Sequence, residues 1–464
     1  MVITAENFFQ YSKCPRWLYL ELHGDSRQKT SPSDFLLRLK KDSLYFEQQV
    51  LKTIPCCVPQ YEPGNYYQGM EKTLALMQQG VDWIAHGALF TNNFLGIPDL
   101  LEKVPGNSLF GTYHYRPVEI KSGRTRRKIY LLQTIFYVHI LEIIQGRLPD
   151  HMGLILSDRR QRLIPVRENY PYFQQVLQEI EAIFQGQEVS PFISSACQNC
   201  PWERTCVAEA WEREDISLIP GLSRQAKERL KNQGIIRISQ LAHLSTRALR
   251  WFQQGSRGLS KRIKLQAQAL ASSQTIQMKR FFLPEKKVEI FLDIESEYQR
   301  GIIYLIGVLV CQDGQEEYRC FVAKDPIEEC RIWQEFLAFM AQWEDDFIVY
   351  HYHTYEPMVL KKLQVKYGGE EDLLQHILGN MADIHKFIKD HLVIPTRSYS
   401  LKEIAKWLGF SWSNHKANAH QSMLWYSLWL ETAQQQYLDW AIEYNRDDCL
   451  ATKVVKEWLI NKVS

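Results

Sequence analysis

The sequence has no apolar run long enough to cross a membrane. Its most apolar stretch, IYLLQTIFYVHILEIIQG from Ile129 to Gly146, is shorter than the roughly 20 residues that span a bilayer, and it contains polar side chains. We expect it to form a buried helix that ends at Gly146. The N-terminus, MVITAENFFQYSKC, lacks the basic and apolar regions of a secretory signal. These absences predict a cytoplasmic protein that does not bind a membrane.

Internal repeats, low-complexity segments and the nucleotide-binding motif G-x-x-x-x-G-K-[ST] are also absent, so ATP-driven unwinding is not expected from this chain. There is no large excess of one charge, since the formal net charge is +2. The charge is unevenly distributed, however. Residues 220–287 contain fifteen Lys or Arg and two acids, a net charge of +13 that leaves −11 for the remainder. A basic middle segment between acidic flanks predicts contact with a polyanion, most simply DNA or RNA.

The length of 464 residues predicts three domains of about 150 residues each. Residues 1–215 alternate between helical and strand patterns, which predicts an α/β domain. Residues 216–287 show two short helical patterns around Gly221 and Gly234 and no strand pattern. Residues 288–464 begin with strand patterns and continue with helical ones, so we expect a second α/β domain and an α/β multidomain protein overall.

Ten cysteines are present, and three of them fall within the segment ACQNCPWERTC at residues 196–206. Because a disulfide framework is not expected in the cytoplasm, Cys197, Cys200 and Cys206 indicate a metal or cluster site that lacks a fourth ligand. Spacing alone does not separate zinc from an iron–sulfur cluster. The cysteines outside this segment, apart from Cys14, are expected to be ordinary thiols.

A first group of candidate catalytic residues lies in GIPDLL and VEIKSG, which contribute Asp99, Glu119 and Lys121. We expect Asp99 to end a strand, and Glu119 and Lys121 to share one face of a second strand. Two carboxylates there suit Mg²⁺ or Mn²⁺, and the ammonium can stabilise charge on a phosphate. A lone exposed Glu/Lys pair is the alternative, but Gln133 and Tyr137, four apart on one helical face, favour a site.

These motifs resemble the RecB-type branch of the PD-(D/E)xK nucleases over about the first 210 residues. The resemblance implies that Asp99 and Glu119 bind the metal, that Lys121 assists hydrolysis, and that the helix with Gln133 and Tyr137 contacts substrate. It also places Glu47 where relatives carry a further metal-site residue, although a surface Glu is the alternative there.

Some members of that branch hold a [4Fe-4S] cluster with one cysteine near the N-terminus and three after the last helix. The resemblance implies Cys14, in YSKCPRWLYL on the opening helix, as the fourth ligand, and it favours the cluster over zinc. The basic middle segment resembles a helix-hairpin-helix module, which binds the nucleic-acid backbone without sequence specificity. A solvated helical linker is the alternative for that segment.

A second group of carboxylates lies at Asp293 and Glu295 in FLDIES and at Asp448 in EYNRDDCLAT, where Tyr444 shares a helical face with Asp448. Carboxylates on an apolar strand are costly to bury unless they bind something, so a metal site is expected. Over residues 288–464 these motifs resemble the RNase H-like DEDD exonucleases, in which the acids hold two metal ions and the Tyr orients water for release of nucleotides from a 3′ end. Glu356 stands where that family has Asp; a Glu can still ligate metal, so the resemblance includes Glu356 in the site, with Asp383 and Asp447 as reserve candidates. Asp447 could replace Asp448.

The complete arrangement resembles bacterial RecB-like nucleases. It predicts a PD-(D/E)xK core with a cysteine clasp, a helix-hairpin-helix-like module and an RNase H-like exonuclease domain. We expect a Mg²⁺- or Mn²⁺-dependent DNA nuclease acting on single-stranded ends or branched DNA in repair, recombination or mobile-element processing, with RNA as the other substrate. The sequence identifies no helicase or repair partner. One alternative is that only one site is active, and the complete motif set favours the N-terminal one. The other is a non-catalytic iron–sulfur DNA-binding scaffold or sensor.

Overall fold

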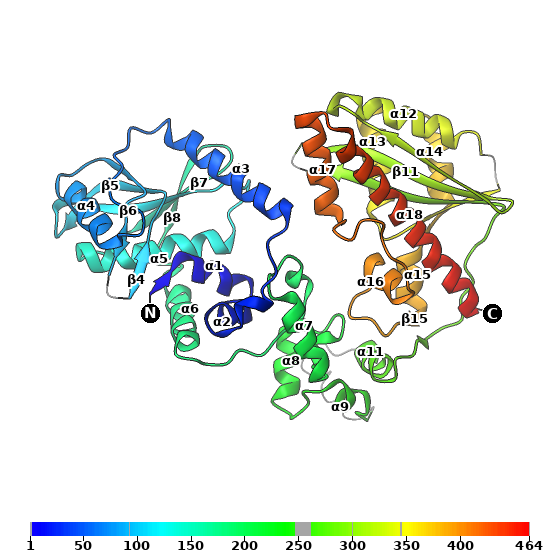
Figure 1. The fold of residues 1–464 in the computed structure, drawn as a ribbon, viewed down its shortest axis with the longest axis horizontal. Helices are drawn as coiled ribbons and strands as arrows, with labels where there is room; N and C mark the ends of the chain where they lie inside the picture. Colours follow the sequence, from blue (N-terminus) through cyan, green and yellow to red (C-terminus); the bar gives the residue numbers. More distant parts are fainter. Residues whose placement is uncertain (1, 92, 246–260, 299, 344–345, 464) are drawn as a thin grey trace. The chain divides into compact units, whose positions relative to one another are not determined.

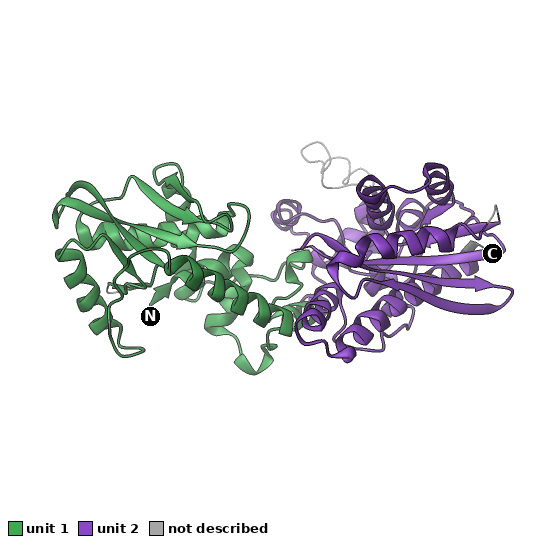
Figure 2. Ribbon diagram, turned by 90° about the horizontal axis from the view of Figure 1, so that it is seen from above, with its two compact units in different colours: residues 1–209 green, residues 210–464 purple. Residues whose placement is uncertain are grey.

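A computed structural model describes residues 2–463 apart from Asn92, residues 246–260, Gln299 and residues 344–345. The chain divides into two compact units, Met1–Glu209 and Ala210–Ser464 (Figures 1 and 2). Both units contain sheets and helices, so the expected α/β multidomain class is confirmed at this level. The finer division into three domains stays a prediction. In the part of the chain that is described, no helix combines the length and the apolarity that a membrane-spanning segment needs.

The first unit contains a five-stranded sheet in the order β2-β5-β6-β7-β8 and a separate three-stranded sheet in the order β1-β4-β3. Only β6 and β7 pair in parallel in the larger sheet, and the connection between them is α5. The strands are β1 Ile3–Thr4, β2 Trp83–Ala85, β3 Leu89–Phe90, β4 Phe94–Gly96, β5 Leu100–Ser108, β6 Gly111–Ile120, β7 His151–Ile155 and β8 Gln161–Pro165. The helices are α1 Ala5–Lys13, α2 Pro15–His23, α3 Asp34–Leu51, α4 Tyr66–Gln78, α5 Lys128–Gln145, α6 Tyr170–Phe184 and α7 Glu203–Glu212, which continues across the division between the units.

The most apolar stretch of the sequence forms α5, which is buried and ends at Gly146 with φ of 64°, as predicted. Helices α1, α5 and α6 meet through Phe8, whose ring centroid lies 4.8 Å from that of Phe136 and 5.4 Å from that of Phe173. Burial of each such ring contributes about 2–3 kcal/mol. This packing holds α5 beside the edge of the fold that carries the first group of candidate residues.

Gly96 explains part of the GIPDLL motif. A Cβ at this position would lie 2.6 Å from Cδ1 of Tyr137 on α5, closer than any ordinary carbon contact. Glycine therefore lets the segment that leads to Asp99 run directly against the Tyr137 ring.

The second unit contains a five-stranded mixed sheet in the order β12-β11-β10-β13-β14 (Figure 1). Strands β10, β11 and β12 are antiparallel neighbours, whereas β10, β13 and β14 run parallel. The strands are β9 Ile276–Gln277, β10 Val288–Glu297, β11 Ile302–Gln312, β12 Gln315–Val322, β13 Phe347–His351, β14 Met381–Asp383 and β15 Leu392–Val393. The helices are α8 Arg224–Lys231, α9 Ile238–Ala242, α11 Lys261–Ser272, α12 Glu329–Met340, α13 Tyr355–Tyr367, α14 Glu371–Gly379, α15 Ile384–His391, α16 Leu401–Trp407, α17 Ala419–Thr432 and α18 Gln435–Val463.

Alternation along β10 divides the core of the second unit into two layers. Ile290 and Leu292 pack in a cluster with α12, α13 and α14, whereas Phe291 packs in a cluster with α15, α16, α17 and α18. Asp293 and Glu295 are in phase with Phe291, so they lie on the α18 side of the sheet. The acids therefore interrupt an apolar layer, as the strand pattern predicted.

In the described residues, the basic segment between the two groups of candidate residues contains the helices α8, α9 and α11, as predicted, but it also contains the short strand β9, which the sequence did not predict. Gly221 and Gly234, with φ of 80° and 76°, form the turns around α8. Three of its basic residues, Arg247, Arg250 and Arg257, lie in residues 246–260 and so outside the described residues.

Candidate functional site

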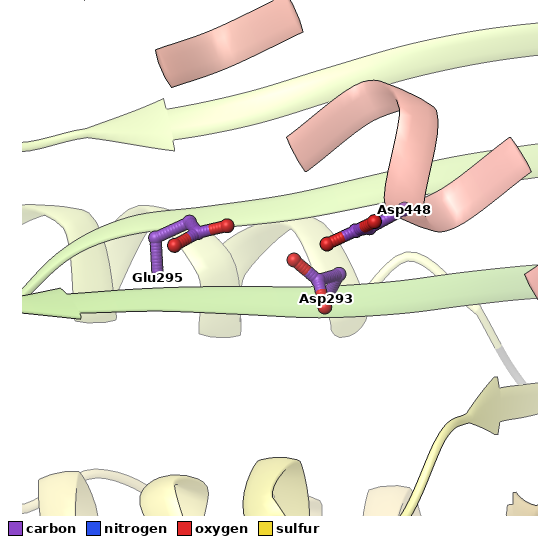
Figure 3. A group of neighbouring side chains, drawn as sticks. All are labelled: Asp293, Glu295 and Asp448. Atoms are coloured by element: carbon purple, nitrogen blue, oxygen red, sulfur yellow. The ribbon is translucent and has the colours of Figure 1, made fainter. Parts of the chain in front are cut away.

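Three carboxylates of the second unit converge at one point (Figure 3). Asp293 and Glu295 come from β10 and Asp448 comes from α18, and one oxygen of each lies within 4.8 Å of the others. A divalent cation that is coordinated by carboxylate oxygens requires ligands at this separation. The arrangement could bind Mg²⁺ or Mn²⁺.

Asp293 is held by an amide from α18. Asn445 Nδ2 donates to Asp293 Oδ2 at 2.7 Å, and Tyr318 OH donates to Asn445 Oδ1 at 2.8 Å, which orients the amide. Gly307 stands opposite Asp293 in the register of β10 and β11, and a Cβ there would lie 1.6 Å from Asn445 Oδ1. Glycine at this position is therefore required for Asn445 to reach Asp293.

Asp448 is held by an indole and a phenol. Trp412 Nε1 donates to Asp448 Oδ1 at 2.7 Å, and the hydroxyl of Tyr444, one turn earlier on α18, is also hydrogen-bonded to Asp448. Lys402 packs over the Trp412 ring at 5.3 Å and donates to the carbonyl of Ala417, which fixes the loop between α16 and α17. This loop therefore contributes directly to the position of one of the three acids.

Glu295 is held by a pair of hydroxyl groups. Tyr304 OH lies 3.4 Å from Glu295 Oε2 and 2.7 Å from Ser422 Oγ on α17. Apart from Tyr444, the sequence analysis named none of the supporting residues around the three acids. Asn445 lies in the same motif as Asp448 and could have been found there, but no spacing in the sequence relates Tyr304 or Trp412 to the acids.

The pKa values of all three carboxyl groups are raised. Burial raises the pKa of Asp293 well above its usual value, and the neighbouring Asp448 and Glu295 raise it further. Burial also raises the pKa of Glu295 to about 8 and that of Asp448 to about 6. Repelling carboxylates in a buried site are stable only when protons or a cation neutralise them. A donor set made only of carboxylate oxygens fits Mg²⁺ or Mn²⁺ better than a soft metal.

These raised pKa values predict that the metal-free protein loses stability between about pH 5 and pH 8. In this range the folded acids Asp293 and Glu295 hold protons that the unfolded chain has released, so the free energy of unfolding falls as pH rises. Urea unfolding in a chelator at several pH values measures this. Added Mn²⁺ should restore stability more at pH 8 than at pH 5, because protons compete with the metal. Stability that is flat or rising over this range without metal would contradict the prediction.

The other acids considered for the second site have different surroundings. Glu356, at the start of α13, is buried with its Oε2 3.4 Å from His351 Nδ1, and it is outside the group of three. Asp383 accepts from the backbone of His353 at 3.0 Å and caps α15. Asp447 accepts from the backbone N–H of Ser413 at 2.7 Å and from its hydroxyl at 3.2 Å. The structure therefore brings Asp448, and not Asp447, to Asp293 and Glu295.

The first unit brings together Asp99, Glu119 and Lys121. Asp99 directly precedes β5 and does not end a strand, which corrects the expectation from the sequence. Strand β5, which follows Asp99, pairs with β6, and Leu100 stands opposite Val118. Strand β6 contains Glu119 but ends at Ile120, so Lys121 lies one residue beyond the strand that the sequence predicted for it. Lys121 Nζ is paired with Glu119 and lies 3.8 Å from Asp99 Oδ2.

The pKa of Asp99 is raised to about 8 by burial and by the charge of Glu119. His86, which the sequence analysis did not name, lies beside these acids with its Nε2 2.8 Å from Glu47 Oε1. Its pKa is raised by Glu47 first and by Asp99 and Glu119 as well. Tyr137 on α5 is buried, and burial and Glu119 raise its pKa.

Gln133, one turn before Tyr137 on α5, is half-buried. No spacing in the sequence distinguishes His86 from an ordinary surface histidine, which is why it was missed.

The four candidate cysteine ligands lie in the first unit. Cys14 lies between α1 and α2 and not within the opening helix, because its extended backbone, φ −164°, separates the two. Burial raises the thiol pKa of Cys200 to about 11 and that of Cys206 to about 12, and the nearby thiols of Cys14 and Cys197 raise both. In the described residues, no three cysteine sulfurs fall within 4.8 Å of one another, so no cysteine cluster of that kind is evident.

The C-terminal part of the chain has a recognisable family. Residues 290–460 match the family described as the RNase H superfamily. This segment is an RNase H superfamily domain. The mixed sheet of the RNase H-like domain is consistent with that fold, and the three convergent acids lie inside the matched residues. No curated protein matches the chain.

An RNase H-like domain implies a nucleic-acid substrate. Together with an acidic group that could hold Mg²⁺ or Mn²⁺, it indicates a metal-dependent nuclease.

Proposed function

We propose that this protein hydrolyses phosphodiester bonds in DNA and that Asp293, Glu295 and Asp448 of the RNase H-like domain form the metal-binding active site. The observation that carries this proposal is the convergence of these three carboxylates within 4.8 Å inside the matched domain. The burial of these carboxylates supports the same conclusion, because it is costly unless a cation neutralises their charge. RNA is the alternative substrate.

Each residue around the acids has a role in this proposal. When bound, a divalent cation neutralises charge on the phosphate and activates water for attack on phosphorus. Asn445 and Trp412 each occupy one oxygen of their carboxylate and so orient the remaining oxygens toward the cation. Tyr444, bonded to Asp448, is placed to orient the attacking water. Glu356 adjoins the site without belonging to the group of three.

We further propose that the first unit is a RecB-type PD-(D/E)xK nuclease with a second metal site at Asp99 and Glu119. Lys121 pairs with both acids and can stabilise charge on a phosphate. The raised pKa of Asp99 supports a site that is completed by a cation. The expected substrates are single-stranded ends or branched DNA in repair, recombination or mobile-element processing.

The experiment that tests the proposal is degradation of end-labelled DNA and RNA by the anaerobically purified full-length protein, with and without Mn²⁺. Lys121→Ala and Asp293→Asn are assayed separately and together, which assigns activity to each unit. We expect the double variant to be inactive. Unchanged substrate in the presence of Mn²⁺, with DNA still bound, would contradict the proposal and favour a non-catalytic scaffold.

We also propose that Cys14, Cys197, Cys200 and Cys206 ligate a [4Fe-4S] cluster, with zinc as the less favoured alternative. The Cys14 thiol raises the pKa of Cys197, Cys200 and Cys206, which supports the proximity of the four thiols. A cluster separates its ligands more than a single ion does, because each thiolate bonds a different iron. Ligation would tie residue 14 to the end of the unit and couple metal binding to folding.

Cys14→Ala should remove the iron chromophore and lower the melting temperature by at least about 5 °C, since about 1 kcal/mol shifts Tm by 2–4 °C in units of this size. Absorbance and iron content measure the first effect and calorimetry the second. Cys57→Ala, an exposed cysteine in the same unit, is the matched control and should change neither. Iron retained without Cys14, or stoichiometric zinc in its place, would contradict the cluster.

A further inference from the structure

The basic helical segment is attached to the RNase H-like domain through α11. Arg262 donates to the carbonyls of Lys389 and, at 2.9 Å, Leu392, and its guanidinium lies 5.1 Å from the Tyr399 ring centroid. Gln266 Nε2 donates to Ile394 O at 2.6 Å. These bonds join α11 to the backbone at the end of α15 and in β15.

Neighbouring contacts extend this attachment on both sides of α11. Toward the C-terminus, β9 pairs with β15 and Met278 N donates to His391 O at 2.7 Å. Phe281 then enters the core layer of the RNase H-like domain. Toward the N-terminus, α9 packs against α11, and Gln268 Nε2 lies 3.3 Å from Ala242 O. The basic segment is therefore continuous with the domain that holds the three acids.

Part of the positive charge of the segment is used for its own structure. Lys227 is buried and bonds to Asp215 Oδ1 at 2.9 Å, and Arg262 is committed to α15 and β15. Other basic side chains are exposed, among them Lys231 in α8 and Lys261 in α11. Exposed cations of this kind attract phosphate without sequence specificity.

Helix α15 connects the attachment point to the edge of the sheet where the parallel strands β13 and β14 end. It extends about 12 Å from Ile384 to His391. Ile384 and Ile388 pack in the same core layer as α18, and Lys386 and Lys389 are exposed on the helix surface. The helix therefore carries two cations between α11 and the carboxyl edge of the sheet.

An exposed ring lies where α15 begins. His353, which follows β13, has a left-handed backbone with φ of 79°, and its ring centroid is 4.6 Å from that of His385 on α15. Asp383 accepts from its backbone N–H at 3.0 Å and so fixes the turn. A histidine ring presented in this way can stack on an unpaired base.

We propose that Lys261, Lys389, Lys386 and His353 form a track that binds single-stranded nucleic acid and leads it to the acids of the RNase H-like domain. The inference rests on the proposed function of that domain and adds which element delivers its substrate. The lysines bind phosphates and the exposed imidazole stacks on a base, so the ligand is an unpaired strand. The basic segment thereby serves the site at Asp293.

The test compares Lys386→Gln/Lys389→Gln with the parent, both carrying Lys121→Ala so that only the RNase H-like site contributes to hydrolysis. We expect KM for a labelled single strand to rise about tenfold, with kcat changed less than twofold. In the inactive Lys121→Ala/Asp293→Asn background, the dependence of log affinity on log salt should become shallower by about 1.4, the value for two lost contacts with a single strand.

Lys361→Gln/Lys362→Gln is the matched control. These exposed lysines lie on α13, whose buried residues pack in the layer on the other face of the sheet. The control should bind and hydrolyse as the parent does. An equal loss in the control, or an unchanged salt dependence in the α15 variant, would overturn the track. If the parent does not hydrolyse nucleic acid but the α15 variant shows the expected shallower salt dependence, the proposed function is overturned and the track stays in place.

Discussion

Asp293→Asn is expected to abolish the nuclease activity of the RNase H-like domain and, at the same time, to stabilise the metal-free protein. The activity should fall at least about 10³-fold, because the cation loses a charged ligand that contributes several kcal/mol to the transition state. The amide oxygen can still accept the bond from Asn445 that Asp293 accepts now. The loss therefore reports on charge and metal binding, not on misfolding.

The gain in stability follows from the raised pKa of Asp293, which burial and the neighbouring acids cause. A neutral amide does not carry that penalty, so the free energy of unfolding without metal should rise by about 1–3 kcal/mol near pH 8. Urea unfolding in a chelator and nucleotide release with Mn²⁺ measure the two effects on one preparation. With Lys121→Ala present in both proteins, so that the first unit does not contribute, an activity above a tenth of the parent's would show that Asp293 is not a metal ligand.

Asp439→Asn supplies the control, since Asp439 is an exposed acid on the same helix as Asp448. Its Oδ1 accepts a hydrogen bond from Gln435 Nε2 at 2.8 Å on the exposed face of the helix. The same chemical change there should leave activity intact and shift stability by less than about 0.5 kcal/mol.

Gly307→Ala should have the second largest effect. The added methyl would occupy the position of Asn445 Oδ1, 1.6 Å from the new Cβ, so the amide must move away from Asp293. Overpacking of this kind costs about 1–3 kcal/mol, and loss of a residue that orients a metal ligand costs about 10–100-fold in activity or metal affinity. Unfolding and Mn²⁺ titration of the same samples give both numbers.

Gly379→Ala is the matched control, because among the described residues a Cβ at that position in α14 would meet no atom within 4 Å apart from its chain neighbours and its own helix backbone. A double variant, Gly307→Ala/Asn445→Ser, separates the two effects. The shorter side chain should recover part of the stability while activity stays low, since Asp293 still lacks its amide donor. If Gly307→Ala binds Mn²⁺ as tightly as the parent, Asn445 does not position Asp293.

Local periodicity was enough to predict much of the candidate site. Residues two apart on a strand share a face, so Asp293 and Glu295 had to lie on one side of β10. Residues four apart share a face of a helix, so Tyr444 had to lie beside Asp448. The apolar run that forms α5 and the glycine turns around α8 were predictable for the same reason, because each depends on neighbours in the sequence.

The predictions that failed concern the ends of elements and the choice between adjacent residues. Cys14 lies between two helices and Asp99 precedes a strand, although the pattern placed each within or at the end of an element. Asp447 and Asp448 are both acidic and adjacent on α18, and no pattern ranks them. The loop with Trp412 and Ser413 decides between them by bonding each to a different partner.

The sequence by itself determined which acids share a face, where the cysteines are concentrated and where the positive charge lies, since composition and short-range spacing contain that information. Only the tertiary structure decided that Gly307 makes room for Asn445, that His86 joins Asp99, and that Arg262 is a structural residue and not a free cation. These pairs are separated by many residues in the chain. Their meeting depends on the packing of whole helices on whole sheets, which no local pattern records.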